Sequence, residues 1–106
     1  MKEISLKHLK GSWWIVTEDF YHNGVLIHKG FKTDLASIPR LLWSICPPFG
    51  NYTTPAVIHD HAYGTKYNSR KEADKGFRDN CIAYGVKKWK ANLFYRTVRI
   101  FGRSHY

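Results

Sequence analysis

The sequence predicts an α+β fold, in which a β-hairpin near the N-terminus precedes a core of antiparallel helices. Two observations carry this prediction. The first third of the chain is rich in β-branched and aromatic residues around an Asn-Gly pair, and the second half contains closely spaced helix start and stop signals. The 106 residues, 43% hydrophobic and 16% aromatic, are enough for a single small domain over residues 1–106 with a modest core and one site.

The hairpin is expected over about residues 13–28. Residues 13–17 and 24–28 are rich in β-branched and aromatic side chains, as strands are. The Asn23-Gly24 pair between them favours a tight turn, because both residue types tolerate a positive φ. The sequence therefore predicts that these two segments pair with each other.

Three helices are expected, at about residues 55–67, 70–84 and 87–101. For the first helix, Thr54 is a suitable N-cap because its hydroxyl can accept a hydrogen bond from a backbone N–H of the first turn. Pro55 suits that first turn, where a missing N–H leaves no hydrogen bond unmade.

The second helix has the clearest boundaries. Ser69 and Glu72 have the spacing of a capping box, in which each side chain bonds to the backbone of the other residue. Gly85 is a suitable C-terminal stop, because glycine adopts the left-handed conformation without strain. Pro39 can also open a short helix at about 39–45, before the first of these three helices.

A histidine and two carboxylates are the most informative feature of the chain. On the first helix, Tyr63 lies on the same face as His59, four residues earlier, while Asp60 is turned by roughly 100°. Helices joined by a short link normally pack antiparallel, so Asp74 on the second helix is expected to meet the His59 ring, with Phe77 packed beneath it.

This arrangement indicates general-base chemistry. A carboxylate such as Asp74 fixes the tautomer of the histidine and stabilises the imidazolium that forms when His59 takes a proton from water. Asp60 then remains for a hard divalent cation such as calcium, which prefers oxygen ligands. Asp34 is the best candidate for a second carboxylate ligand. It lies in an irregular stretch whose backbone carbonyls are not used in the hydrogen bonds of a β-sheet.

Several residues also occur in an order typical of a known family. They are Asp34, Ser37, Pro48-Phe49-Gly50, His59-Asp60, Tyr63, Asp74 and Phe77. In this order they resemble the compact phospholipase A2 enzymes of bacteria, fungi and parvovirus capsids, which share an H-D-x-x-Y helix and a following helix with A-D-x-x-F. The resemblance implies a phospholipase A2-like helical core.

The resemblance to phospholipase A2 also implies a role for each matched residue. His59 would activate water, Asp74 would orient the histidine, and Tyr63 would support the pair as a hydrogen-bond donor. Asp60 would bind calcium together with Asp34 or with loop carbonyls. The function implied is that of a calcium-dependent hydrolase acting on a phospholipid ester at a membrane surface.

A second resemblance covers more of the chain. Residues 30–40 match the pattern G-F-x-T-D-L-A-S-[IV]-P-R, and a helix with His-Asp follows. This combination is similar to a family of small, largely phage-encoded proteins of unknown function. It implies other phage proteins as partners, and a place in the host cytoplasm or the virion, because no signal peptide or membrane-spanning apolar run is evident.

Positive charge is the other strong signal. The formal net charge is +9, and residues 86–106 contain six Lys and Arg residues and no Asp or Glu. Candidates for binding substrate or another anion are Arg40, Lys87, Lys88 and Lys90. A basic C-terminal helix with aromatic residues suits an anionic membrane, and it suits nucleic acid equally well.

Two alternatives to the hydrolase therefore stay open. One is a non-catalytic structural or assembly protein of a phage particle, which keeps the polar helix pair as a rigid core. The other is a basic accessory protein that binds nucleic acid through its last helix. Cys46 and Cys81 are expected to be reduced thiols, because the cytoplasm keeps thiols reduced, although the two could in principle form a disulfide.

Overall fold

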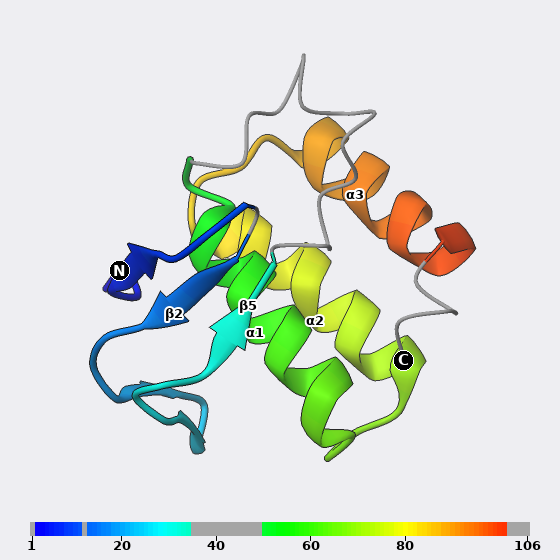
Figure 1. The fold of residues 1–106 in the computed structure, drawn as a ribbon. Coiled ribbons are helices and arrows are strands. Elements are labelled where there is room, and N and C mark those ends of the chain that lie inside the picture. Colours follow the sequence, from blue (N-terminus) through cyan, green and yellow to red (C-terminus); the bar gives the residue numbers. More distant parts are fainter. Residues whose placement is uncertain (1, 12, 35–49, 102–106) are drawn as a thin grey trace.

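The computed structural model describes residues 2–11, 13–34 and 50–101, and within them the fold is α+β, as predicted (Figure 1). Short strands come first and helices follow. The strands are β1 (Leu6–His8), β2 (Trp14–Val16), β3 (Phe20–His22), β4 (Val25–Ile27) and β5 (Lys32–Thr33). The helices are α1 (Thr53–Thr65), α2 (Arg70–Ala83) and α3 (Lys88–Phe101), and each end lies within two residues of its predicted place.

The strands form two small antiparallel sheets, so the predicted hairpin over 13–28 is wrong in its pairing. Asn23 and Gly24 do form a tight turn, with φ values of 49° and 79°. This two-residue turn pairs β4 with the strand immediately before it, β3. The other predicted strand, β2, pairs instead with β1 on one side and β5 on the other. The error has a simple cause, because a two-residue turn can only join strands that adjoin it.

The start of α1 also differs from the prediction. The helix begins at Thr53, and its N-cap Tyr52 makes no side-chain capping bond. Thr54 lies inside the first turn and is fully buried. Its hydroxyl donates to the Glu3 carboxylate at 2.6 Å and accepts the Ile4 backbone N–H at 3.0 Å. Thr54 therefore ties the N-terminal segment to the helix instead of capping it.

The ends of α2 follow the sequence signals closely. The Ser69 hydroxyl accepts from the Glu72 backbone N–H at 3.1 Å, and the Glu72 carboxylate accepts from the Ser69 backbone N–H at 3.2 Å. This confirms the capping box. At the other end, Gly85 has a φ of 95° and donates to the Ile82 carbonyl, while Val86 donates to the Cys81 carbonyl. These two bonds form a Schellman motif.

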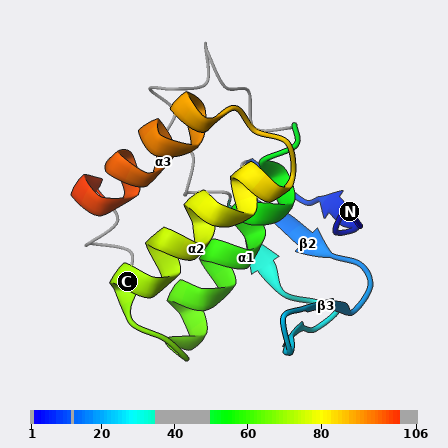
Figure 2. The same cartoon turned by 180° about the vertical axis from the view of Figure 1, so that it is seen from behind.

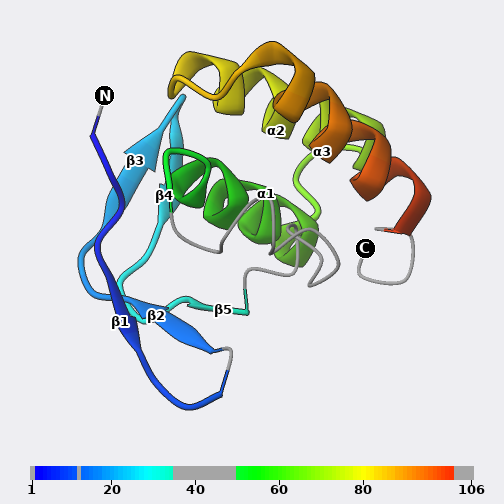
Figure 3. The ribbon, with the colours of Figure 1, turned by 90° about the horizontal axis from the view of Figure 1, so that it is seen from above.

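The helices α1 and α2 lie side by side and run antiparallel, as Figures 1 and 2 show. The link between them is four residues long, which brings α2 straight back along α1. The third helix packs on α2 at the edge of the molecule farthest from the strands, a position that Figure 3 shows from above. Because α2 packs against both other helices, its side chains decide how all three fit together.

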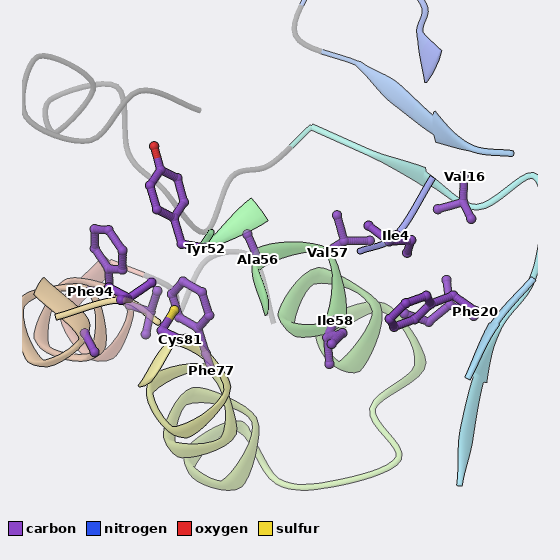
Figure 4. Close-up of a cluster of buried hydrophobic side chains, with 14 residues drawn as sticks. Ile4, Val16, Phe20, Tyr52, Ala56, Val57, Ile58, Phe77, Cys81 and Phe94 are labelled. Atoms are coloured by element: carbon purple, nitrogen blue, oxygen red, sulfur yellow. The ribbon is translucent and has the colours of Figure 1, made fainter. Parts of the chain in front are cut away.

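The core joins the helices to the strands. Val57 and Ile58 of α1 point towards the strand side of the core, where Val16 and Phe20 are buried (Figure 4). On the helix side, Phe77 of α2 stacks on Phe94 of α3 with ring centroids 5.9 Å apart. Cys81 is fully buried beside them and carries a free thiol. The helix predicted at 39–45, Arg40 and Cys46 lie outside the described residues.

Replacing Thr54 by valine is expected to lower the free energy of unfolding by about 1 to 3 kcal/mol, because the Ile4 N–H loses its acceptor inside the protein. Urea unfolding followed by circular dichroism measures this change. Thr65→Val in the same helix is the matched control, because the Thr65 hydroxyl bonds the His61 carbonyl at the exposed helix end. An equal loss of unfolding free energy in the two variants would contradict the role of Thr54 in holding the N-terminal segment to α1.

Candidate functional site

A histidine and an aspartate meet inside the α1–α2 interface. Nε2 of His59 lies 2.7 Å from Oδ1 of Asp74. The two residues are 3% and 0% exposed, so the contact is shielded from water. Their meeting confirms the expected contact between the first and second helices. It follows from the antiparallel packing, which places the middle of α1 against the early part of α2.

Tyr63 and Phe77 frame the histidine ring. The Tyr63 hydroxyl donates to Oδ1 of Asp74, the same oxygen that faces His59. The ring centroids of Tyr63 and His59 are 4.2 Å apart. The ring centroid of Phe77, on α2, lies 4.9 Å from that of His59. A ring packed against two aromatic neighbours has little freedom to rotate, so the aromatic frame fixes the direction in which its nitrogens point.

A third donor to Asp74 comes from the last helix. Nη1 of Arg99 lies 3.0 Å from Oδ2 of Asp74. Arg70, at the start of α2, donates to the Val98 carbonyl at 3.1 Å and so holds the same turn of α3 in place. The sequence prediction missed Arg99, although a buried carboxylate needs a counter-charge and the predicted last helix carries several cations.

These contacts decide the charge of Asp74. Burial alone would raise its pKa, but the hydrogen bonds from His59, Tyr63 and Arg99 outweigh burial, and the pKa is held below its usual range. Asp74 is therefore an anion and an acceptor at neutral pH. Nε2 of His59 is therefore the donor in this contact, and in a neutral ring the lone pair lies on Nδ1. Burial, together with the Asp74 bond, raises the pKa of the Tyr63 hydroxyl, which stays a donor.

The predicted metal ligands lie on another side of α1. Oδ2 of Asp60 accepts a hydrogen bond from the Thr33 hydroxyl of β5. Asp34 follows Thr33 directly, so the chain brings it to the part of α1 that carries Asp60. Among the described residues, no group of three or more His, Cys, Asp and Glu side chains could hold a metal ion.

A pocket of about 320 Å³ reaches the histidine from the side of the β3–β4 turn. Its apolar wall includes Ile58, Ala62 and Phe77, and His59 lines it beside them. Polar groups that line it are His22, Asn23, Asn68, Glu72, Asp79 and Asn80. Among the described residues that line it are two carboxylates and no Lys or Arg, so this lining favours neutral or apolar groups over a phosphate.

The predicted anion-binding lysines lie elsewhere. Lys87 directly precedes α3, and Lys88 and Lys90 lie in its first turn. Arg99, which contacts Asp74, is nine residues beyond Lys90, or roughly 14 Å along the helix axis. The structure therefore does not bring these lysines to the histidine.

The whole region belongs to a recognisable sequence family. The family model described as "Protein of unknown function (DUF1353)" matches residues 13–98. The chain belongs to this family. The matched range includes α1, which carries His59, and α2, which carries Asp74. The match confirms the predicted membership of a family of unknown function. The expected phage origin and the likeness to phospholipase A2 stay predictions.

Two relatives come from Sinorhizobium fredii. "Uncharacterized protein y4iH" is 36% identical over 102 residues, which make up 94% of this chain and 42% of that protein. "Uncharacterized protein y4jT" is 39% identical over 75 residues, which make up 69% of this chain and 22% of that protein. The chain thus spans less than half of either relative. No solved structure matches the chain.

None of the helices in the described ranges is both long enough and apolar enough to cross a membrane.

Replacing Arg99 by methionine is expected to raise the pKa of Asp74 and to lower the free energy of unfolding by about 1 to 3 kcal/mol at neutral pH. Since the folded-state pKa of Asp74 is depressed, its stabilising effect is complete above the ordinary value of 3.8 and is lost as the pH falls through the lower folded value. In the variant this loss begins at higher pH.

Urea unfolding between neutral and acid pH measures this effect. Arg96→Met is the matched control, because Arg96 is exposed on the same helix. Identical acid profiles for the two variants would show that Arg99 does not set the charge of Asp74.

Proposed function

We propose that the chain is a phospholipase A2-like hydrolase, in which His59 activates water against an ester. The observation that carries the proposal is the hydrogen bond between His59 and Asp74, supported by Tyr63. A histidine held by a buried anion in one tautomer has the geometry that general-base catalysis requires. The order of the matching residues along the chain supports the same proposal.

In this mechanism each residue has a separate task. Asp74 accepts the Nε2 proton and so fixes the tautomer in which Nδ1 is the base. When Nδ1 takes a proton from water, the negative charge of Asp74 stabilises the imidazolium. Tyr63 and Arg99 hold Asp74 ionised and in place. The apolar wall of the pocket beside His59 suits an acyl chain, and its carboxylates disfavour the phosphate of a lipid.

Calcium is the metal that the resemblance implies, and the oxygen donors near β5 suit it in kind. Asp60 and Asp34 would hold the ion, with the rest of its about six to eight oxygen ligands coming from carbonyls and water. When bound there, calcium would supply Lewis-acid polarisation of the ester carbonyl. Thr33 keeps the Asp60 carboxylate oriented in its absence.

A second candidate is a non-catalytic structural or assembly role on the same scaffold. The burial of the pair favours it, since the His59 and Asp74 side chains are only 2% and 0% exposed. A buried polar network of this kind can serve packing specificity alone. Activity measurements on matched variants separate the two roles.

The hydrolase proposal predicts release of fatty acid from mixed phosphatidylcholine and phosphatidylglycerol vesicles in the presence of calcium. His59→Gln should reduce the rate by about 100-fold or more, because it removes the base. His28→Gln is the control, because His28 is exposed on the strand side. Absence of release by the wild type, or equal rates in both variants, would leave the structural role.

Calcium binding gives an independent test. Isothermal titration of the wild type should show binding that Asp60→Asn weakens strongly, since it removes a charged ligand. Asp79→Asn is the control for a lost exposed carboxylate, because Asp79 lies on α2, away from the proposed ligands in the chain, and its carboxylate pairs with Arg78 at 3.2 Å. Equal affinity in the two variants would place calcium elsewhere.

A further inference from the structure

A glycine lies at the middle of the α2 face that lines the pocket beside the histidine. Gly76 is in the interior of α2, where glycine destabilises a helix relative to alanine. On a regular helix, Ala73 and Asn80 lie within about 60° of this glycine on one side. Glu72 and Asp79 lie equally close on the other side, and all five residues line the pocket. A Cβ atom at Gly76 would meet no other atom within 4 Å, so the missing side chain leaves room in the pocket.

The two carboxylates that line the pocket both have a cation beside them on α2. Asp79 pairs with the Arg78 guanidinium at 3.2 Å. Glu72 belongs to the capping box, and Lys75 follows it by three residues on the same part of the helix surface. These opposite charges offset one another, so the local charge favours neither an anion nor a cation. At about 320 Å³ the pocket is at the small end of ligand sites, and it suits a small neutral ligand.

Two carboxamide side chains share one histidine nitrogen at the β3–β4 edge of the pocket. Nε2 of His22 lies 3.2 Å from Oδ1 of Asn80 and 3.3 Å from Nδ2 of Asn23. A ring nitrogen carries either a proton or a lone pair, so it can donate to Asn80 or accept from Asn23, but it cannot do both. In addition, Nδ2 of Asn80 and Oδ1 of Asn23 have no hydrogen-bond partner among the described residues. The pocket therefore has an amide donor and an amide acceptor to spare.

We propose that this pocket binds a neutral secondary amide that carries short aliphatic groups. Asn80 donates to the carbonyl oxygen of the ligand, and Asn23 accepts a hydrogen bond from its N–H. The aliphatic part packs on Ile58 and Ala62 in the room above Gly76. A secondary amide has one donor and one acceptor, which matches this pair of side chains, whereas a carboxylate only accepts and an ammonium only donates. The proposal concerns binding alone and does not depend on the proposed hydrolase.

Titration of the isotope-labelled full chain, followed by NMR, tests the proposal. The probes are N-butylacetamide and methyl pentyl ketone, which has the same length but a methylene group in place of the amide N–H. Backbone signals of the β3–β4 turn and of the residues around Gly76 should shift. The amide should bind about fivefold more tightly than the ketone, as expected for one further hydrogen bond. Equal affinity for the two probes, or shifts confined to other parts of the chain, would overturn the proposal.

Two asparagine variants separate the two hydrogen bonds. Asn23→Gly keeps the turn, because glycine tolerates the positive φ, and it should abolish the preference for the amide while the ketone binds as before. Asn80→Asp keeps an oxygen for His22 but removes the amide donor, so both probes should bind about fivefold more weakly. The matched control is Asn92→Asp, the same change at an exposed position of α3. Equal affinities of Asn80→Asp and Asn92→Asp for the amide would count against the proposed site.

Filling the pocket gives a separate test. Gly76→Leu places a side chain in the room that the glycine leaves, so it should abolish saturable binding of both probes. Gly64→Leu is the control, because Gly64 is an exposed helical glycine of α1 with equally open surroundings and is not among the residues that line the pocket. Circular dichroism establishes that each variant is folded, and the asparagine variants decide the question if Gly76→Leu is not. A folded Gly76→Leu that binds the amide as the wild type does would refute the proposal.

A peptide and an N-acyl sugar both present a neutral secondary amide next to a small aliphatic group. N-acetylalanine N-methylamide and methyl N-acetylglucosaminide, titrated under the same conditions, distinguish these two sources. The tighter of the two should lose affinity in Asn80→Asp and in Gly76→Leu but not in Asn92→Asp. Since every readout is binding, the result is independent of whether the chain hydrolyses an ester. Binding that all three variants leave unchanged would place the amide outside this pocket.

Discussion

The carboxylate of Asp74 is the constraint on which the rest of the structure depends. It is fully buried and ionised, and an ionised group without partners in such a place would cost several kcal/mol. Its partners come from both neighbouring helices, His59 and Tyr63 from α1 and Arg99 from α3. Neither helix can slide along α2 without leaving a buried charge unsatisfied. The same contacts that position the histidine therefore set the register of the helix packing.

Local signals in the sequence were sufficient wherever the structure is local. The Ser69 capping box and the Gly85 stop depend on residues only a few positions apart, and both formed as predicted. The pairing of β2 and the role of Thr54 depend on segments far away in the chain. Thr54 bonds residues 50 and 51 positions before it, and no local pattern distinguishes such a tether from a helix cap.

The contacts of the candidate site differ in the same way in how far they could be predicted from the sequence. His59 and Asp74 could be matched from sequence, because helical spacing fixes their faces and a short link fixes the helix direction. Arg99 could not, because its contact depends on how α3 crosses α2, which side-chain packing decides. The resemblance to phospholipase A2 that the residue order predicts assigned roles to single residues. It gave no information on the third donor to Asp74.

The buried thiol of Cys81 has a consequence for how the core can be studied and damaged. Burial raises its pKa to about 12, so almost none of it is thiolate at physiological pH. The thiolate is the species that oxidants and alkylating reagents attack. Cys81 is thus protected twice, by the absence of solvent and by its protonation. Its alkylation, followed on the peptide that contains it, would report how often the helices separate.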